Sequence, residues 1–347
     1  MEGGRRTMLA AVVKRPGELV IEQVEKPVPG PRQFLIKTLA ASICNATDNH
    51  ILEGIFDGYH DRYPQILGHE VCGRVVEVGS EVTEVKPGDR IAMYTPYGAF
   101  AEYVPVDADG YGYAIVPENV PDEVASICEM FDGAFRSTIA CAEVKKGEKI
   151  LIIGAGPMGL TAAAAAVACG ATVAVTDLYQ NRLDKALEMG ASFAYNRSEM
   201  SSEEILQALM RDLGPVDTAC MCIALDRSRE NDAFYLPVEA LKENGRMTGL
   251  CVEVKLKDHN HWMTPFHLTR KNIKFRHNLE RPGTVADFQR GYDMVGEGKI
   301  PMEKLITHRI DLDGLPWALD LCHNHPDQCI KVVVYPKRSE ERKGEPV

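Results

Sequence analysis

The sequence predicts an α/β protein of two domains, one β-rich and barrel-like and the other a doubly wound parallel sheet. Three observations lead to this prediction. The chain has 347 residues, which is more than one hydrophobic core usually fills. Residues 8–106 hold short apolar runs divided by glycine and proline, a pattern typical of strands. From about residue 149, strand-like runs alternate with helix-like runs, and this alternation favours a parallel sheet.

In the N-terminal region, strands are expected wherever apolar residues alternate with polar ones. Turn residues separate these runs, as in the KPGD segment at residues 86–89. Proline and glycine supply the backbone angles that tight turns need. The strands expected from the pattern are residues 9–13, 34–39, 71–78, 90–93 and 101–104.

The second region predicts two consecutive strand-helix units. Gly170 and Gly190 follow the two helices, where glycine suits the left-handed position that ends a helix. The expected strands are residues 149–153, 172–176, 216–222, 245–250 and 272–275, and the two helices are residues 157–169 and 180–189. After about residue 282, a helix at 285–295 and strands at 307–311 and 330–335 are expected to return to the first domain.

Charge and composition argue against nucleic acid and membranes as partners. The chain has 39 basic and 50 acidic residues, a formal net charge of −11 that repels phosphate backbones and anionic lipids. The N-terminus lacks the apolar stretch of a secretory signal, and the apolar run at residues 160–168 is far shorter than the ~20 residues that span a bilayer. The ten cysteines have no spacing typical of a disulfide framework, which favours a reducing cytoplasm.

A glycine-rich turn between the first strand and the first helix of the second region matches the GxGxxG pattern. It consists of Gly154, Gly156 and Gly159, with Pro157 and Met158 at the start of the helix. Glycines let a pyrophosphate approach the backbone, and the free N–H groups at the helix N-terminus bind its charge. Ordinary tight turns can match the same pattern, so the position between a strand and a helix is what favours a dinucleotide site.

The end of the second strand of this region predicts which dinucleotide is bound. Asp177 stands there, where a carboxylate accepts hydrogen bonds from the ribose hydroxyls and repels a 2′-phosphate. We therefore expect NAD rather than NADP. Arg182 follows in the next helix and either contacts the same ribose or is a solvated helix residue. The structural alternative for Asp177 is a helix cap.

A second motif carries metal-ligand chemistry. Residues 68–82 read GHEVCGRVVEVGSEV and fit the pattern G-H-E-x2-G-x5-G-x2-V. His69 offers an imidazole, Glu70 a carboxylate and Cys44 a thiolate, and three protein ligands with one open position are what a catalytic zinc requires. Taken alone, Cys44 and His69 would more often be buried core residues. Together with the glycine-rich turn, the motif resembles the zinc-containing medium-chain alcohol and polyol dehydrogenases, including the sorbitol dehydrogenases.

This resemblance implies a fold and a reaction. The fold is a GroES-like β-barrel catalytic domain formed by residues 1–140 and 283–347, with a Rossmann NAD-binding domain formed by residues 141–282. The expected reaction is the zinc-dependent, NAD-linked oxidation of a secondary alcohol on a polyol, cyclitol or sugar-like substrate to a ketone. A homodimer or homotetramer is also expected, since relatives pair their cofactor domains edge to edge.

The resemblance also implies a fourth zinc ligand and a further cofactor contact. Glu129 lies where the polyol-dehydrogenase branch carries a Glu-Pro ligand, although Met130 replaces the proline and Cys128 is a neighbouring rival. Since the family alternates between the two acids, both Glu70 and Glu129 remain candidate ligands. Lys331 matches a position where a basic residue meets the pyrophosphate, and its alternative is an exposed strand lysine.

Two segments depart from the family pattern. The family usually has Cys-Gly-Thr/Ser-Asp-x-His, whereas residues 44–50 read CNATDNH, one residue longer. By resemblance, Thr47 holds the substrate hydroxyl, His50 passes its proton to solvent and Asp48 orients the histidine ligand, while a polar turn that caps a helix is the alternative for His50. Residues 89–103 contain no cysteine, so the lobe that binds a structural zinc is missing. One zinc per chain is expected.

Pocket polarity favours a polyhydroxylated substrate. By resemblance, His277 and Asn278 approach the nicotinamide, and Glu102, Asp132 and Arg136 lie near the substrate. Each residue alone is more often an ordinary surface or salt-bridge residue. A glutamate in the metal site adds to the expectation of a polyol.

Two other functions remain open from the sequence. A zinc-free quinone or enone reductase of the same superfamily also lacks the structural lobe, but such enzymes generally lack ligands equivalent to Cys44 and His69. A non-catalytic NAD-binding redox sensor or structural protein is disfavoured because the ligands are intact. Metal analysis tests the first alternative, and turnover with a polyol tests the second.

Overall fold

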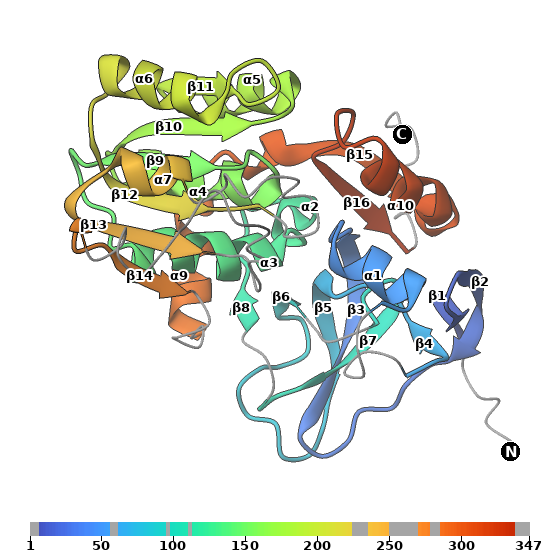
Figure 1. The fold of residues 1–347 in the computed structure, drawn as a ribbon. Coiled ribbons are helices and arrows are strands. Elements are labelled where there is room, and N and C mark those ends of the chain that lie inside the picture. Colours follow the sequence, from blue (N-terminus) through green and yellow to red (C-terminus); the bar gives the residue numbers. More distant parts are fainter. Residues whose placement is uncertain are drawn as a thin grey trace, which may run out of the picture. The chain divides into compact units, whose positions relative to one another are not determined.

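The computed structural model describes residues 7–55, 62–94, 98–109, 113–223, 235–249, 270–277 and 285–336 (Figure 1). The chain divides into two units, which we call unit 1 and unit 2. Unit 1 comprises Met1–Glu129, Thr284–Gly296 and Leu305–Val347, and unit 2 comprises Met130–Gly283 and Glu297–Lys304. The first boundary lies ahead of the helix η1 (Phe131–Cys141) and not after it, and a short segment beyond residue 296 belongs to unit 2.

Unit 1 contains two sheets whose strands come from both ends of the chain. The smaller sheet has the order β2-β1-β4, and the larger has the order β15-β16-β3-β5-β6-β8, with β7 also pairing with β3. Neighbouring strands are antiparallel except β15 and β16, which are parallel. The strands are β1 (Thr7–Arg15), β2 (Glu18–Glu25), β3 (Gln33–Ser42), β4 (Gln65–Ile66), β5 (Glu70–Val78), β6 (Arg90–Tyr94), β7 (Tyr103–Asp107), β8 (Tyr113–Ile115), β15 (Ile306–Asp311) and β16 (Lys331–Tyr335).

The register of β3 brings distant parts of unit 1 together. Ser42, at the end of β3, is opposite Glu70 on one neighbouring strand and opposite Val333 on the other. Phe34 and Ile36 of the same strand are completely buried in the core of the unit. A strand paired on both sides and buried on both faces has little freedom to shift its register, because a slip of one residue would expose its apolar side chains. The backbone position of the end of β3 is therefore fixed by its pairing with both neighbouring strands.

Short helices complete unit 1. Tyr292 on α9 donates a hydrogen bond to the carbonyl oxygen of Ala125 at 2.6 Å, which ties α9 to α2. The helices are α1 (Thr47–Glu53), α2 (Asp122–Ala125), α3 (Cys128–Met130, at the boundary), α9 (Val285–Gly296), η6 (Leu312–Gly314) and α10 (Leu315–Asn324).

Unit 2 is a parallel sheet with its first strand in the middle. The order is β11-β10-β9-β12-β13-β14, and every neighbouring pair is parallel. This is the strand order of doubly wound dinucleotide-binding folds, so the predicted α/β fold class is confirmed. The strands are β9 (Lys149–Ile153), β10 (Thr172–Asp177), β11 (Phe193–Asn196), β12 (Val216–Met221), β13 (Leu241–Gly249) and β14 (Lys274–His277).

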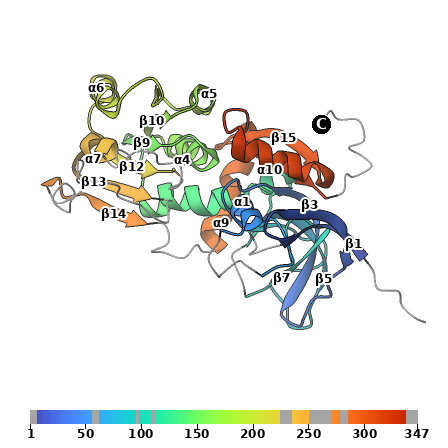
Figure 2. The same cartoon turned by 45° about the vertical axis from the view of Figure 1, so that its right-hand side comes forward.

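Helices pack against both faces of this sheet. On β9, Leu151 and Ile153 pack with residues of α6 and α7, while Ile150 and Ile152 are fully buried on the opposite face, which explains the unbroken apolar run of this strand. Figure 2 shows α4 and α7 beside the middle strands. The helices are α4 (Pro157–Ala168), α5 (Gln180–Glu188), α6 (Ser202–Asp212), α7 (Tyr235–Ala240) and most of η5 (Met302–Leu305). Among the described residues, no helix has the length and apolarity that a membrane crossing requires.

A few elements differ from the sequence prediction. The strand expected at residues 101–104 begins two residues later, since β7 starts at Tyr103 and Ala101 forms only an isolated bridge with Ala10. The strand β2 was not expected, because its charged and apolar residues are half buried and give a weak pattern. Gly170 and Gly190 do have positive φ angles, 81° and 103°, after α4 and α5.

Candidate metal and dinucleotide sites

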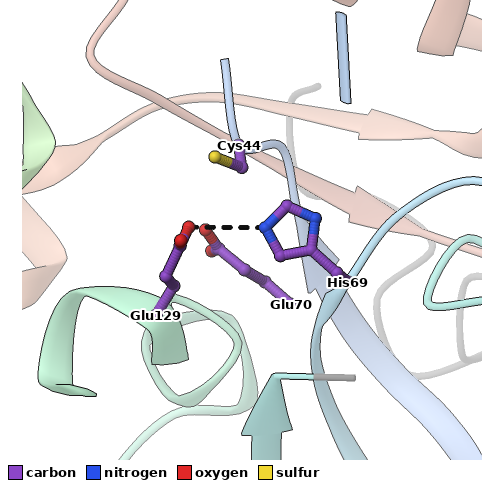
Figure 3. Close-up of side chains that lie close together, drawn as sticks. All are labelled: Cys44, His69, Glu70 and Glu129. Carbon is purple, nitrogen blue, oxygen red and sulfur yellow. Dashed lines mark hydrogen bonds and ion pairs between the residues drawn. The ribbon is translucent and has the colours of Figure 1, made fainter. Parts of the chain in front are cut away.

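Four potential metal ligands converge in unit 1. Cys44 follows β3, His69 and Glu70 stand at the start of β5, and Glu129 belongs to α3. Their ligand atoms all lie within 4.8 Å of one another. Figure 3 shows the four side chains pointing toward a common centre. The sequence-predicted ligands are thus brought together, although they come from three separate segments.

Asp48 sets the orientation of the imidazole. Its Oδ1 lies 3.1 Å from Nδ1 of His69, and its Oδ2 accepts a hydrogen bond from the backbone N–H of Cys44 at 2.9 Å. Asp48 is fully buried in α1. With Nδ1–H donating to this carboxylate, the lone pair of Nε2 is directed at the centre of the cluster. Burial lowers the pKa of His69, but the charge and hydrogen bond of Asp48, together with hydrogen bonds to Cys44 and Glu129, raise it well above the usual value.

The two glutamates have different surroundings. Oε1 of Glu70 accepts a hydrogen bond from Nζ of Lys331 at 2.7 Å, and its Oε2 accepts one from the Ser42 hydroxyl. Burial raises the pKa of Glu70, although the charge of Lys331 opposes this. Glu129 has its Oε2 3.4 Å from Nε2 of His69. Burial would raise the pKa of Glu129 as well. The hydrogen bond to His69 and the positive charge of that imidazole instead lower the pKa of Glu129 to about 2.

Lys331 has a role different from the expected one. It is only 2% exposed, and its ammonium donates to Glu70 and, at 2.9 Å, to the carbonyl oxygen of Ile43. Burial disfavours its charge, but the carboxylate of Glu70 raises its pKa. The side chain is therefore neither an exposed strand lysine nor free to meet a pyrophosphate. Its place follows from β16 pairing with β3, which the sequence does not reveal.

The donor set fits a zinc ion. A thiolate, an imidazole and carboxylates are ligands that zinc accepts together. Around a tetrahedral zinc, ligand atoms are about 3.3–3.8 Å apart, and the 3.4 Å between Glu129 and His69 agrees with that spacing. Three buried or half-buried carboxylates, those of Asp48, Glu70 and Glu129, face one lysine and one histidine, so a divalent cation would also balance the charge.

Cys128, the expected rival of Glu129, is turned away from the cluster. Its thiol donates to the carbonyl oxygen of Met93 at 2.7 Å, and burial raises its pKa well above the usual value. Ser42 was missed by the sequence analysis. Its position two residues before Cys44, three residues after an expected strand, was the only available signal.

The expected proton-relay residues lie on α1. Thr47 is the first residue of this helix and is half-buried, as is His50. The N-cap is Ala46, which makes no side-chain cap hydrogen bond. The helix therefore does not begin with a polar side-chain cap, which was the alternative for this segment.

The expected substrate residues divide into two groups. Glu102 has a structural role in unit 1, because its carboxylate accepts a hydrogen bond from the N–H of Leu9 at 2.7 Å. Arg136 is buried in η1 of unit 2. The side chains of Asp132 and His277 and the whole of Asn278 lie outside the described residues.

The glycine-rich turn of unit 2 has the form that the sequence motif predicts. A Cβ at Gly159 would lie 1.8 Å from the carbonyl oxygen of Gly154, and a Cβ at Gly154, whose φ is +96°, would lie 2.6 Å from the carbonyl oxygen of Cys222. At Gly156, which caps α4, the nearest atom is Nη1 of Arg182 at 3.8 Å. The first and third glycines are required by packing, whereas the second leaves open space at a helix N-terminus. That space suits a phosphate.

Asp177 connects this turn to the next one. It ends β10 and is 8% exposed. Its Oδ2 accepts a hydrogen bond from Ala155 N–H at 2.6 Å, and its Oδ1 accepts one from Tyr179 N–H at 2.9 Å. Tyr179 and not Asp177 is the N-cap of α5. Each carboxylate oxygen has a second lone pair, so both remain able to accept a ribose hydroxyl.

Comparison with known families covers both units. The alcohol dehydrogenase GroES-like domain family matches residues 30–118. The zinc-binding dehydrogenase family matches residues 157–297. The first match covers most of the β-rich region with Cys44, His69 and Glu70, and the second begins at Pro157 within the glycine-rich turn.

Curated relatives match along nearly the whole chain. An L-threonine 3-dehydrogenase of Anaeromyxobacter is 31% identical, over 90% of this chain and 95% of its own length. Sorbitol dehydrogenase 1 of Saccharomyces cerevisiae is 26% identical, over 94% of this chain and 97% of its own length. The crystal structure of a zinc-binding dehydrogenase from Sinorhizobium meliloti, bound to NADP, has a TM-score of 0.80 at 24% identity and covers 95% of this chain and 100% of that one. This last likeness concerns the fold alone. The chain therefore belongs to the zinc-containing medium-chain alcohol dehydrogenase family, and it is an oxidoreductase that acts on CH–OH groups.

Proposed function

We propose that this chain is a zinc-dependent, NAD-linked dehydrogenase that oxidises a secondary alcohol of a polyol, cyclitol or sugar-like molecule to a ketone. The observation that carries the proposal is the cluster of Cys44, His69, Glu70 and Glu129. A catalytic zinc needs three protein ligands and one open position. A zinc-free quinone or enone reductase would have no use for four converging ligand groups, so that alternative fits the cluster poorly.

In this proposal Cys44, His69 and Glu129 hold the zinc. Glu70 does not bind the zinc and is instead paired with Lys331. Glu129 has its Oε2 3.4 Å from Nε2 of His69, whereas both oxygens of Glu70 already accept hydrogen bonds from other side chains. When bound, zinc supplies Lewis acidity that lets an alcohol lose its proton near neutral pH. Asp48 keeps the imidazole in the tautomer that binds a metal.

Thr47 and His50 are the proposed path of the substrate proton. Both lie on α1, three and six residues after Cys44 in the sequence, and both are half-buried. A half-buried histidine can accept a proton at one ring nitrogen and release one to solvent from the other, since the imidazole carries two exchangeable nitrogens. Thr47 would hold the hydroxyl in place for this transfer.

The proposed redox cofactor is NAD. The open space at Gly156 and the N-terminus of α4 suit a pyrophosphate. Asp177 suits the two free hydroxyls of an adenosine ribose and would repel a 2′-phosphate. The NADP in the Sinorhizobium structure belongs to a protein only 24% identical, so it does not decide the cofactor of this chain.

The substrate class rests on similarity. The sorbitol dehydrogenase relatives support a polyol. The L-threonine 3-dehydrogenase relatives, 31% identical in one case, make a β-hydroxy amino acid the second class to test. A panel of polyols, cyclitols and amino alcohols with NAD would distinguish them, because turnover restricted to amino alcohols would contradict the polyol proposal.

Metal content and ligand variants test the proposal directly. We expect about one zinc per chain, with turnover lost and NADH binding kept in Cys44→Ala and His69→Ala. The matched control is Cys72→Ala, which removes a fully buried thiol of β5 outside the cluster. It should keep both zinc and turnover. Two tightly held zinc ions, or an active Cys44→Ala enzyme, would contradict the mechanism.

Two amide variants separate the glutamates. Glu70→Gln should lower zinc affinity about 10- to 100-fold, the usual effect of losing a partner behind a ligand. Glu129→Gln should lower it further, because a direct ligand is lost. Competition with a chromogenic chelator measures both constants. A weaker effect at Glu129 than at Glu70 would reverse the proposed roles.

We also propose that the protein forms a dimer or tetramer through the edge of the parallel sheet. Among the described strands, β14 ends that sheet, and Phe275 on it is 39% exposed. An unpaired edge strand offers backbone groups to a second copy. Sedimentation at micromolar concentration tests this, and a monomer would count against it.

A further inference from the structure

Two cysteines lie together at the end of β12 in unit 2. Their sulfur atoms, those of Cys220 and Cys222, are 3.6 Å apart. Residues two apart on a strand point to the same side, so this closeness follows from the Cys-Met-Cys sequence. Cys220 is fully buried, and Cys222 is partly exposed. The pair thus has one thiol that a reagent can reach and a second one directly behind it.

The surroundings of Cys220 lower the pKa of its thiol. The Cys222 thiol and the hydroxyls of Thr248 and Ser137 are hydrogen-bond partners of its sulfur, and together they lower the pKa of Cys220 to about 7 in spite of burial. Ser137 Oγ lies 3.5 Å from the sulfur. Thiol-disulfide exchange requires the thiolate form, so such a pair is reactive near neutral pH.

A second cysteine pair provides an internal comparison. In unit 1, Cys322 and Cys329 have their sulfur atoms 3.4 Å apart, and both residues are only 3% exposed. The hydrogen bond between them and their burial raise the pKa of Cys322. Sulfur proximity is therefore the same in both pairs, whereas access and acidity differ. Only the pair in unit 2 has the features of an oxidisable dithiol.

The pair also adjoins the glycine-rich turn. The N–H of Cys222 donates to the carbonyl oxygen of Ile153 at 2.8 Å. The carbonyl oxygen of Cys222 lies 2.6 Å from the position of a Cβ at Gly154, and its own Cβ lies 3.4 Å from that of a Cβ at Gly159. Cys222 therefore lies directly against the turn, and a shift of Cys222 toward it would displace the turn.

We propose that Cys220 and Cys222 form a reversible disulfide and that its closure weakens dinucleotide binding at the neighbouring turn. The disulfide is argued from the geometry of unit 2 alone. Its effect on dinucleotide binding rests on the proposed NAD site. Along a strand, Cα atoms two residues apart are about 6.6 Å from each other, close to the upper limit of about 6.8 Å for a disulfide. Closure therefore requires a local backbone shift, which also makes the bond easy to reduce.

The oxidant in this proposal is a low-molecular-weight disulfide such as oxidised glutathione. Cys222, which passes its thiol proton to the neighbouring Cys220 thiolate, attacks one sulfur of the oxidised glutathione, forms a mixed disulfide and expels one glutathione thiolate. The Cys220 sulfur then attacks the Cys222 sulfur and expels the second. Two protein thiols are oxidised to one disulfide, one glutathione disulfide is reduced to two thiols, and the protons pass to the glutathione.

Mass analysis and a binding titration test the two halves separately. The whole zinc-loaded protein is treated with oxidised glutathione, alkylated and digested with trypsin. The peptide of residues 212–227 contains only these two cysteines, and we expect it to lose two hydrogen atoms. We expect NADH affinity to fall about tenfold, within the usual range for coupled events, and to recover with dithiothreitol. Cys322→Ser should behave like the natural protein, and in Cys220→Ser the affinity should not respond to the oxidant.

Each half can be overturned independently. An intact dithiol in peptide 212–227 after oxidation, or a disulfide that forms at Cys322 and Cys329 instead, would overturn the assignment. A complete disulfide with unchanged NADH affinity would overturn the coupling, as would a loss of affinity in Cys220→Ser, in which Cys220 and Cys222 cannot form a disulfide. If the reduced protein binds no dinucleotide at all, the proposed function fails while the peptide mass still decides the chemistry of the dithiol.

Discussion

In unit 1 the candidate site is made of side chains, whereas in unit 2 it is made of backbone. The metal cluster combines residues from the ends of β3, β5, α1, α3 and β16, and its charges face one another in a buried setting. The glycine-rich turn is continuous in sequence and offers N–H groups at the start of α4. A side-chain site depends on charge balance across distant segments. A backbone site depends on the absence of side-chain atoms at a few positions.

This difference predicts opposite weaknesses. The metal cluster should be sensitive to changes in charge that leave the shape alone, because an unpaired buried charge is costly. The glycine-rich turn should be sensitive to one added methyl group that leaves the charge alone, because its atoms are already in contact. Three variants test these expectations.

The largest effect is expected from Lys331→Met. The change leaves Glu70 buried without its cation, which should lower the free energy of unfolding by about 3–5 kcal/mol. Adding Glu70→Gln to the same chain should recover much of this loss, since no buried charge then remains unpaired. Denaturant unfolding of the zinc-loaded protein measures both.

Lys242→Met serves as the matched control for that pair. Lys242 is paired with Asp217 in unit 2, but its side chain is 50% exposed, so its loss should cost less than about 1 kcal/mol. Equal costs at Lys331 and Lys242 would mean that burial does not govern the stability of the cluster.

A smaller effect is expected from Gly159→Ala. Its Cβ would lie 1.8 Å from the carbonyl oxygen of Gly154, and relieving such a backbone contact should cost about 3 kcal/mol. Gly156→Ala is the control, because its nearest neighbour is 3.8 Å away. It should fold nearly as well as the natural chain and yet bind NADH more weakly, since the methyl group occupies the space proposed for the pyrophosphate.

Thermal unfolding and NADH titration of the two variants separate folding from binding. The comparison between the two units breaks down if Gly156→Ala destabilises as much as Gly159→Ala. It also breaks down if Gly156→Ala binds NADH as tightly as the natural protein.

The smallest effect is expected from Asp177→Ser combined with Leu178→Arg. Removing the carboxylate and adding a cation should reduce the preference for NAD over NADP about tenfold, or about 1.4 kcal/mol. Serine keeps an acceptor for the N–H groups that Asp177 now binds, so the turn should persist. Catalytic efficiency with both cofactors is the measurement. Asp184→Ser, which removes an exposed carboxylate of α5, is the control and should leave the ratio unchanged.

The contents of each candidate site were predictable to different degrees. The glycine-rich turn could be read from the sequence together with its strand and helix, because every part of it is local. Cys44, His69 and Glu70 could be recognised as candidate ligands from the sequence, and the structure brings them together with Glu129. The role of Lys331 could not be predicted, since it comes from 261 positions further along the chain than Glu70.

By itself, the sequence determined the fold class, the alternation of strands and helices in unit 2 and the candidate residues for binding metal and dinucleotide, since periodicity and motifs are local properties. Only the tertiary structure decided which charges compensate one another. The pairing of β16 with β3 places Lys331 beside Glu70. The hydrogen bond from the backbone N–H of Leu9 gives the Glu102 carboxylate a structural role. The physical reason is that strand register is set by the burial of whole apolar faces, so polar contacts between distant strands follow from the core and cannot be read from the polar residues themselves.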